Sequence, residues 1–206
     1  MSDIFKEEFI RFLIRREALR FGKFTLKSGL TSPFFINLGD IHKGQDLRFT
    51  GKALAETIDV KFGHVDILFG PPYKGISLAA AASMMYSIVF DKDVSILYNR
   101  KEAKAHGEKG TFVGKLPQKG DKIVVIDDVL TTGGTKVEAI EILEETFDVK
   151  VTGVMVTVDR RKKGADSGLG NYPLHSIITL PDIINYLDQK NSEQADELRK
   201  FYEGGS

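Results

Sequence analysis

The spacing of apolar residues predicts a helix and a hairpin at the start of the chain. Residues 3–20 repeat large apolar side chains at mostly helical spacing, and Asp3 is placed to cap the first turn. Residues 24–26 and 34–36 are short apolar runs on either side of a turn that contains glycine and serine. We therefore predict a helix over residues 3–20, followed by two short strands.

Further along, the pattern alternates between helices and strands. Helical spacing covers residues 44–62, 75–86 and 135–147, and apolar runs typical of buried strands cover 65–69, 94–98, 123–126 and 151–158. Such alternation is typical of a parallel sheet with helices on both faces. We predict an α/β fold with a central, mostly parallel sheet flanked by helices. No internal repeat or linker is visible, so residues 1–206 are expected to form one domain.

The charge and the residue content exclude several classes of protein. Lys plus Arg and Asp plus Glu each total 29, whereas a protein that coats nucleic acid has a basic excess. Cysteine is absent, which excludes disulfides and thiolate chemistry and suits a reducing cytoplasm. The first residues are charged, unlike a secretory signal. The longest uncharged stretch, residues 75–90, is shorter than the roughly 20 residues of a membrane helix, and we predict a buried helix running into a strand.

The clearest chemical signal follows the apolar run 123–126. Two adjacent acids, Asp127 and Asp128, precede a turn of threonines and glycines at 131–135 that leads into a predicted helix. Free N–H groups at a helix start, together with hydroxyls, form a phosphate cradle, and glycine lets the backbone approach a ligand closely. Adjacent carboxylates accept hydrogen bonds from a vicinal diol. The segment predicts a binding site for a ribose 5-phosphate. The alternative is an ordinary strand-to-helix turn with Asp and Thr as caps.

Here the sequence resembles a known family. Residues 127–135 are similar to the phosphoribosyl pyrophosphate (PRPP) binding motif of the type I phosphoribosyltransferases. Other segments resemble parts of the orotate phosphoribosyltransferases in that family. These parts are the amino-terminal signature at 24–37, the pyrophosphate loop at 70–75, the mobile catalytic loop at 98–108, and an orotate-contacting arginine at Arg160.

The resemblance implies a role for each matching residue. The implied PRPP site comprises Lys27, Tyr73, Lys74, Arg100, Lys101, Lys104, His106, Asp127, Asp128, Val129, Leu130, Thr131, Thr132, Gly133, Gly134 and Thr135. The implied orotate site comprises Phe35, Ile36, Thr131 and Arg160, and the implied catalytic residues are Lys104 and His106. Ala105, Lys109 and Pro72 depart from the family pattern. Because they leave the implied catalytic residues and the acids in place, we expect activity to be retained.

Local charge agrees with two anionic substrates. Residues 98–110 hold four bases against two acids, although the alternative for such a run is a solvated surface loop. Lysine suits the point charge of a phosphate, and arginine suits a planar carboxylate. The opposed local charges therefore give a neutral total while leaving a cationic site for small anions.

The activity implied is transfer of the 5-phosphoribosyl group from PRPP to orotate, in de novo pyrimidine biosynthesis. Mg²⁺ is the implied cofactor. The resemblance implies that PRPP holds the ion, which reaches Asp127 or Asp128 only through a water molecule. The resemblance also implies a homodimer that shares the 98–112 loop, a hood formed by residues 1–40 over the base site, and no nucleic-acid or membrane partner. Two alternatives stay open: transfer to a purine base, and a regulator that binds PRPP without chemistry.

Overall fold

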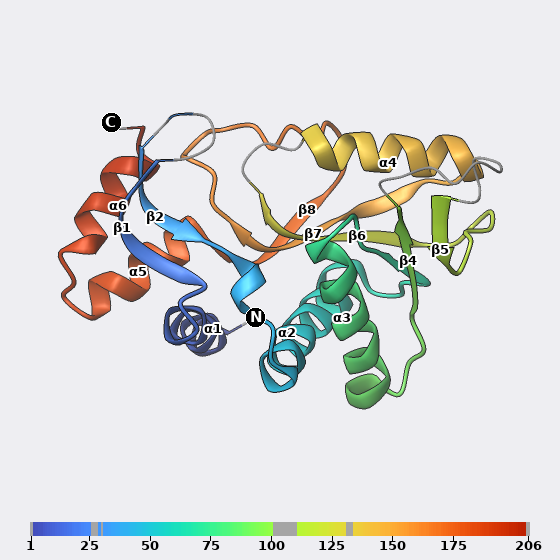
Figure 1. Ribbon diagram of the computed structural model, residues 1–206, viewed down its shortest axis with the longest axis horizontal. Coiled ribbons are helices and arrows are strands. Elements are labelled where there is room, and N and C mark those ends of the chain that lie inside the picture. Colours follow the sequence, from blue (N-terminus) through green and yellow to red (C-terminus); the bar gives the residue numbers. More distant parts are fainter. Residues whose placement is uncertain (1, 26–28, 30, 101–110, 131–133, 205–206) are drawn as a thin grey trace.

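The centre of the protein is a six-stranded sheet in the order β5-β4-β3-β6-β7-β8 (Figure 1). A computed structural model describes residues 2–25, 29, 31–100, 111–130 and 134–204. The strands are β3 (Ile67–Phe69), β4 (Ser95–Asn99), β5 (Phe112–Gly114), β6 (Ile123–Leu130), β7 (Val151–Asp159) and β8 (Leu174–Thr179). Only β5 runs antiparallel to its neighbour. The predicted α/β fold with a mostly parallel sheet is confirmed.

Helices cover both faces of this sheet (Figure 1). On one face lie α2 (Gly44–Phe62) and α3 (Lys74–Phe90), and on the other lies α4 (Gly134–Phe147). Successive side chains of a strand point to opposite faces. Accordingly, Val124 packs in the core cluster that contains α2 and α3, and Val125 packs in the cluster that contains α4. The continuous apolar run of β6 is thus explained by burial on both sides.

A second layer of structure joins the two ends of the chain. The helix α1 (Asp3–Arg15) and the hairpin of β1 (Leu19–Thr25) and β2 (Thr31–Ile36) lie beside α5 (Leu180–Gln189) and α6 (Gln194–Tyr202). A short 3₁₀ helix, Leu38–Asp40, leads from the hairpin toward α2. The Lys6 ammonium lies 2.8 Å from the Asp182 carboxylate, which links α1 to α5. The pattern along the sequence did not predict α5 or α6.

Several predicted element boundaries are wrong, and the first strand of the hairpin begins at Leu19 instead of residue 24. The first helix ends at Arg15 instead of residue 20, because the chain reverses at Glu17 (φ 55°) and Leu19 already pairs with Ile36 in the hairpin. The uncharged stretch 75–90 does not run into a strand. It stays helical to Phe90 and ends at Asp91, whose φ of 53° is left-handed. None of the helices in the described part of the chain combines the length and the apolar character needed to cross a membrane.

Candidate active site

The two adjacent acids lie on β6 itself. The prediction that the strand ends at Ile126 is wrong, because pairing with β7 continues from Asp127, opposite Val156, to Leu130, opposite Asp159. The side chain of Leu130 is buried in the core beneath α4, and its carbonyl accepts the backbone N–H of Arg160. The phosphate-binding turn predicted at 131–135 begins beyond the strand, and residues 131–133 lie outside the described residues.

Each acid binds one backbone N–H and one lysine. The backbone N–H of Asp128 donates to Asp127 Oδ1, and that of Val129 donates to Asp128 Oδ1, both at 2.8 Å. The remaining oxygens are paired: Asp127 Oδ2 lies 2.7 Å from Lys136 Nζ, and Asp128 Oδ2 lies 2.7 Å from Lys74 Nζ. Two carboxylates and two ammonium groups thus form a cluster, the paired acids, whose formal charges cancel.

Burial raises the pKa of Asp127, and the adjacent charge of Asp128 acts in the same direction. The ammonium of Lys136 opposes both effects. The lysine therefore favours the ionised form of Asp127, which accepts hydrogen bonds.

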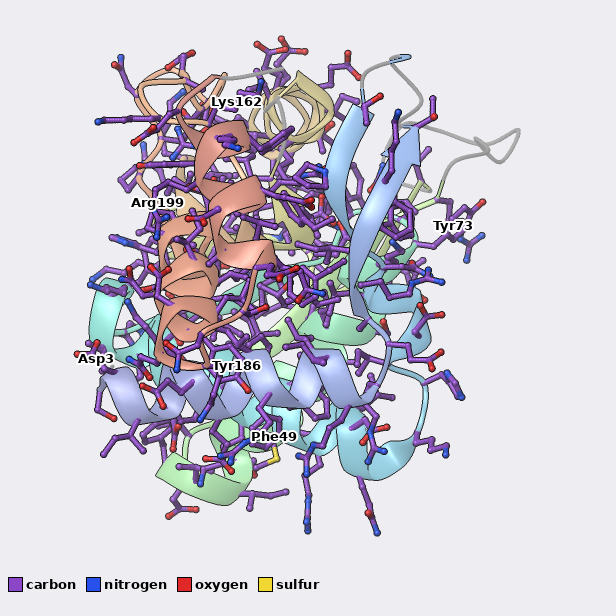
Figure 2. The ribbon with its side chains drawn as sticks, turned by 90° about the vertical axis from the view of Figure 1, so that its left-hand side faces the viewer. Asp3, Phe49, Tyr73, Lys162, Tyr186 and Arg199 are labelled. Atoms are coloured by element: carbon purple, nitrogen blue, oxygen red, sulfur yellow. The ribbon has the colours of Figure 1, made fainter. Side chains whose placement is uncertain are left out.

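The loop at residues 70–75 brings Lys74 to this cluster. A Cβ atom on Gly75 would lie 2.7 Å from the carbonyl oxygen of Ile126, so only glycine lets the start of α3 approach the middle of β6 this closely. The peptide bond between Pro72 and Tyr73 is cis. The side chain of Tyr73 is 70% exposed and projects outward (Figure 2). The predicted pyrophosphate loop therefore presents Lys74 and Tyr73 at the edge of the sheet that carries the acids.

Arg160 follows β7 at the same edge and is a buried cation. Its Nη2 donates to Ser32 Oγ at 3.1 Å, and its guanidinium carbon lies 4.7 Å from the centre of the Phe34 ring. Burial lowers the pKa of Arg160. Within the described part of the chain no carboxylate pairs with this guanidinium. Since an unpaired buried charge is costly, the geometry is that of a site that receives an anion.

The hairpin contacts Arg160 through Ser32 and Phe34, whereas the predicted orotate-site residues Phe35 and Ile36 make other contacts. Ile36 is buried in the core, and the Phe35 ring lies against Phe24 and beneath the guanidinium of Arg20. Sequence reasoning missed the contact that Ser32 and Phe34 make with Arg160. The alternation of β2 indicates only that residues 32, 34 and 36 share the buried face, and it does not identify Arg160 as their partner.

The carboxyl-terminal helix supports this arginine through an aromatic contact. The ring of Phe201 in α6 meets the Phe34 ring edge to face at 5.6 Å, and Lys162 Nζ lies 4.7 Å from the centre of the Phe201 ring. Phe34 in turn stacks on Arg160. The guanidinium is therefore held from α6 as well as from the hairpin.

Phe201→Ala is expected to raise the KM for the anionic ligand of Arg160 about threefold to tenfold, because the aromatic pair contributes roughly 0.5–1.5 kcal/mol. Steady-state kinetics with each substrate varied in turn would measure this. The KM for the other substrate should stay unchanged, and Phe201→Leu, which keeps most of the volume, should recover part of the loss. An equal rise in both KM values would contradict the role assigned to Phe201.

Several predicted site residues cannot be placed. Lys27, Lys101, Lys104, His106, Thr131, Thr132 and Gly133 lie outside the described residues, as does the side chain of Thr135. Gly134 opens α4, and Val129 packs against the core formed with α2 and α3. The ends of the 98–112 loop are described: the backbone N–H of Arg100 donates to the Thr111 carbonyl at 2.8 Å, and β4 pairs with β5.

Sequence reasoning also missed Lys136. Its side chain is only 6% exposed, and its Nζ donates to the Val129 carbonyl at 3.1 Å in addition to pairing with Asp127. One signal was available: the helix dipole disfavours a cation in the first turn of a helix, so a lysine there points to a nearby acid.

Comparison with known proteins places these features in a family. The Phosphoribosyl transferase domain family matches residues 37–184. The chain is 40% identical to an orotate phosphoribosyltransferase of Clostridium beijerinckii over 90% of this chain and 87% of that protein. It is 41% identical to that of Lachnoclostridium phytofermentans over 89% and 85%.

Solved structures agree with these sequence comparisons. The orotate phosphoribosyltransferase of Francisella tularensis superposes with a TM-score of 0.81 at 31% identity, covering 97% of this chain and 100% of that one. The UMP synthase of Leishmania donovani gives 0.76 at 31% identity, covering 96% of this chain and 42% of that one. The predicted family and enzyme class are confirmed: the chain belongs to the orotate phosphoribosyltransferases, within the phosphoribosyltransferase family.

Proposed function

We propose that the protein transfers the 5-phosphoribosyl group of PRPP to orotate, giving orotidine 5-monophosphate and pyrophosphate in de novo pyrimidine biosynthesis. The observation that carries the choice of base is the buried guanidinium of Arg160 without a carboxylate partner in the described chain. The backbone N–H of Arg160 donates to the Leu130 carbonyl, so Arg160 lies next to the strand that carries the acids. Orotate, an acidic pyrimidine, supplies the missing anionic partner, whereas a neutral purine does not.

The paired acids suit the ribose of PRPP. Carboxylate oxygens of Asp127 and Asp128 retain lone pairs for the ribose hydroxyls, and the exposed Lys74 is free to turn toward the pyrophosphate group. Departure of pyrophosphate leaves positive charge on the anomeric carbon and builds negative charge on the leaving group. Lys74, with Lys104 and His106 by family resemblance, stabilises that negative charge.

We propose that Mg²⁺ binds to the protein together with PRPP. Both acids are already paired with lysines, and no group of three or more His, Asp or Glu side chains in the described chain could hold a metal ion. The residues present therefore fit a cation that is bound by the pyrophosphate and reaches Asp127 or Asp128 only through water. When bound, Mg²⁺ neutralises charge on the leaving pyrophosphate.

We extend the proposal to a homodimer in the cytoplasm that shares the 98–112 loop between subunits. Met84 and Ile88 are 59% and 71% exposed and lie one turn apart on α3, and exposed apolar side chains that gather on one face are typical of an interface. Sedimentation of the wild type and of Ile88→Glu tests this. A monomeric wild type would contradict the dimer.

One assay tests the reaction itself. Protein, Mg²⁺, PRPP and orotate are mixed, and the ultraviolet absorbance of orotate is followed with time. Adenine and hypoxanthine replace orotate in parallel reactions. Turnover with a purine but not with orotate would overturn the choice of base, and PRPP binding without turnover of any base would favour a regulator.

Asp127→Asn and Asp128→Asn are each expected to weaken PRPP binding about tenfold or more, because a hydrogen bond to a charged group contributes roughly 1.5–3 kcal/mol. Isothermal titration with PRPP and Mg²⁺ measures the change. Thermal unfolding provides the control: Asp127→Asn should destabilise more than Asp128→Asn, since Lys136 is buried and Lys74 is exposed. Unchanged PRPP affinity in both variants would refute the assignment of the acids to the ribose.

A further inference from the structure

The two lysines of the paired acids differ in burial. The side chain of Lys74 is 43% exposed, and that of Lys136 is 6% exposed. An exposed lysine can leave its acid for a ligand at little cost. A buried lysine cannot, because separation would leave an uncompensated charge inside the protein. The pair of Lys74 and Asp128 is therefore exchangeable, whereas the pair of Lys136 and Asp127 is a permanent part of the site.

Two contacts fix the position of the Lys136 ammonium. Its Nζ lies 2.7 Å from Asp127 Oδ2 and 3.1 Å from the Val129 carbonyl oxygen, so it bridges two residues of β6 on either side of Asp128. Asp127 Oδ1 accepts the backbone N–H of Asp128. Both oxygens of this carboxylate are thereby held, and the direction of its remaining lone pairs is set before any ligand arrives.

We propose that Lys136 is a positioning residue, whose ammonium orients the Asp127 carboxylate for the ribose hydroxyls and occupies the place on Asp127 that a divalent cation would otherwise take. The inference rests on the proposed binding of PRPP. It explains how two adjacent acids at the edge of a sheet, an arrangement that attracts divalent cations, remain available to a sugar.

The charge of the cluster leads to a consequence that can be measured. With both lysines in place, the formal charges of the paired acids cancel. Without Lys136, Asp127 Oδ2 is open beside Asp128 and the cluster carries a net negative charge. A divalent cation should then bind the ligand-free protein directly.

The test measures Mn²⁺ binding to the ligand-free full chain by isothermal titration, with Lys136→Met, which keeps the length of the side chain and removes its charge. The wild type and Lys136→Arg are expected to show no saturable binding up to millimolar Mn²⁺, and Lys136→Met is expected to bind it saturably. The double variant Asp127→Asn/Lys136→Met removes both partners and is expected to lose that binding again.

A second measurement addresses orientation. Lys136→Met is expected to weaken PRPP binding about tenfold, on the scale of one hydrogen bond to a charged group, while the KM for orotate stays unchanged. Circular dichroism of each variant verifies folding. Should Lys136→Met fail to fold, the double variant carries the test by comparison with Asp127→Asn. Its PRPP affinity should equal that of Asp127→Asn, because Lys136 acts through the Asp127 carboxylate, and a further loss would overturn the role of Lys136.

The outcomes separate this inference from the proposed function. A folded Lys136→Met that gains no Mn²⁺ binding, or that keeps its PRPP affinity, overturns the role of Lys136 even if the enzyme turns over orotate. Saturable Mn²⁺ binding by the wild type also overturns it. Failure of the wild type to use orotate instead overturns the proposed function and leaves the Mn²⁺ result standing on its own.

Discussion

Arg160→Met is expected to lower kcat/KM for orotate by about 10²-fold, because removal of one partner of a buried charge pair costs roughly 3 kcal/mol. The guanidinium is buried against Phe34, donates to Ser32 and has no carboxylate partner in the described chain, so the orotate carboxylate is the group that would lose its counter-charge. Steady-state kinetics at saturating PRPP measures the change. Direct titration of PRPP should give the wild-type affinity, since Arg160 does not contact the paired acids.

The thermal stability of Arg160→Met provides a control, because it is not expected to fall. An unpaired buried cation destabilises the ligand-free protein, so methionine at this position should leave the thermal midpoint unchanged or raise it. Arg160→Lys should recover little activity, because an ammonium lacks the planar pair of donors that fits a carboxylate. A kcat/KM for orotate near the wild-type value in Arg160→Met would contradict the assignment.

Lys104→Ala is expected to lower kcat by roughly 10²-fold or more, on the scale of removing one donor that stabilises transition-state charge. The reason is chemical: negative charge grows on the departing pyrophosphate, and family resemblance assigns Lys104 to that group. Single-turnover measurements at saturating PRPP and orotate isolate this step from product release. The affinity for PRPP should change much less than kcat, since the charge to be stabilised develops during the reaction.

A second lysine in the same segment provides a matched control. Lys109 lies within 98–112, carries the same charge and has no role implied by the resemblance. Lys109→Ala should therefore turn over at a rate close to that of the wild type. Equal losses in Lys104→Ala and Lys109→Ala would show that the loop acts only through its total charge, and a normal rate in Lys104→Ala would remove it from the mechanism.

Local sequence patterns predicted the elements whose bounds depend on residues close together in the chain. The helix at 44–62 was predicted to the residue, and the order of the central strands and helices follows from alternating apolar runs. Boundaries failed where a tertiary contact decided them. Strand β6 continues through two charged residues because β7 lies beside it, and the first helix stops at Arg15 because Leu19 is needed opposite Ile36.

The motifs were readable because they are contiguous. Strand, acids, turn and helix follow one another within residues 123–147, so the chemistry of a ribose 5-phosphate seat could be inferred without a structure. Lys136 and Ser32 were missed for the opposite reason. Their partners are Asp127, nine residues earlier along the chain, and Arg160, 128 residues away, and no periodicity reports such pairs.

The fold class, the family and the kind of ligand could be inferred from the sequence alone, since these depend on periodicity and on short motifs. Which cations have partners became known only from the folded chain. It placed Lys74 and Lys136 on the two acids, and it buried Arg160 among Ser32 and Phe34 with no carboxylate beside it in the described chain. The physical reason is that the energy of a charge depends on burial and on its neighbours, and both arise only when distant segments pack together.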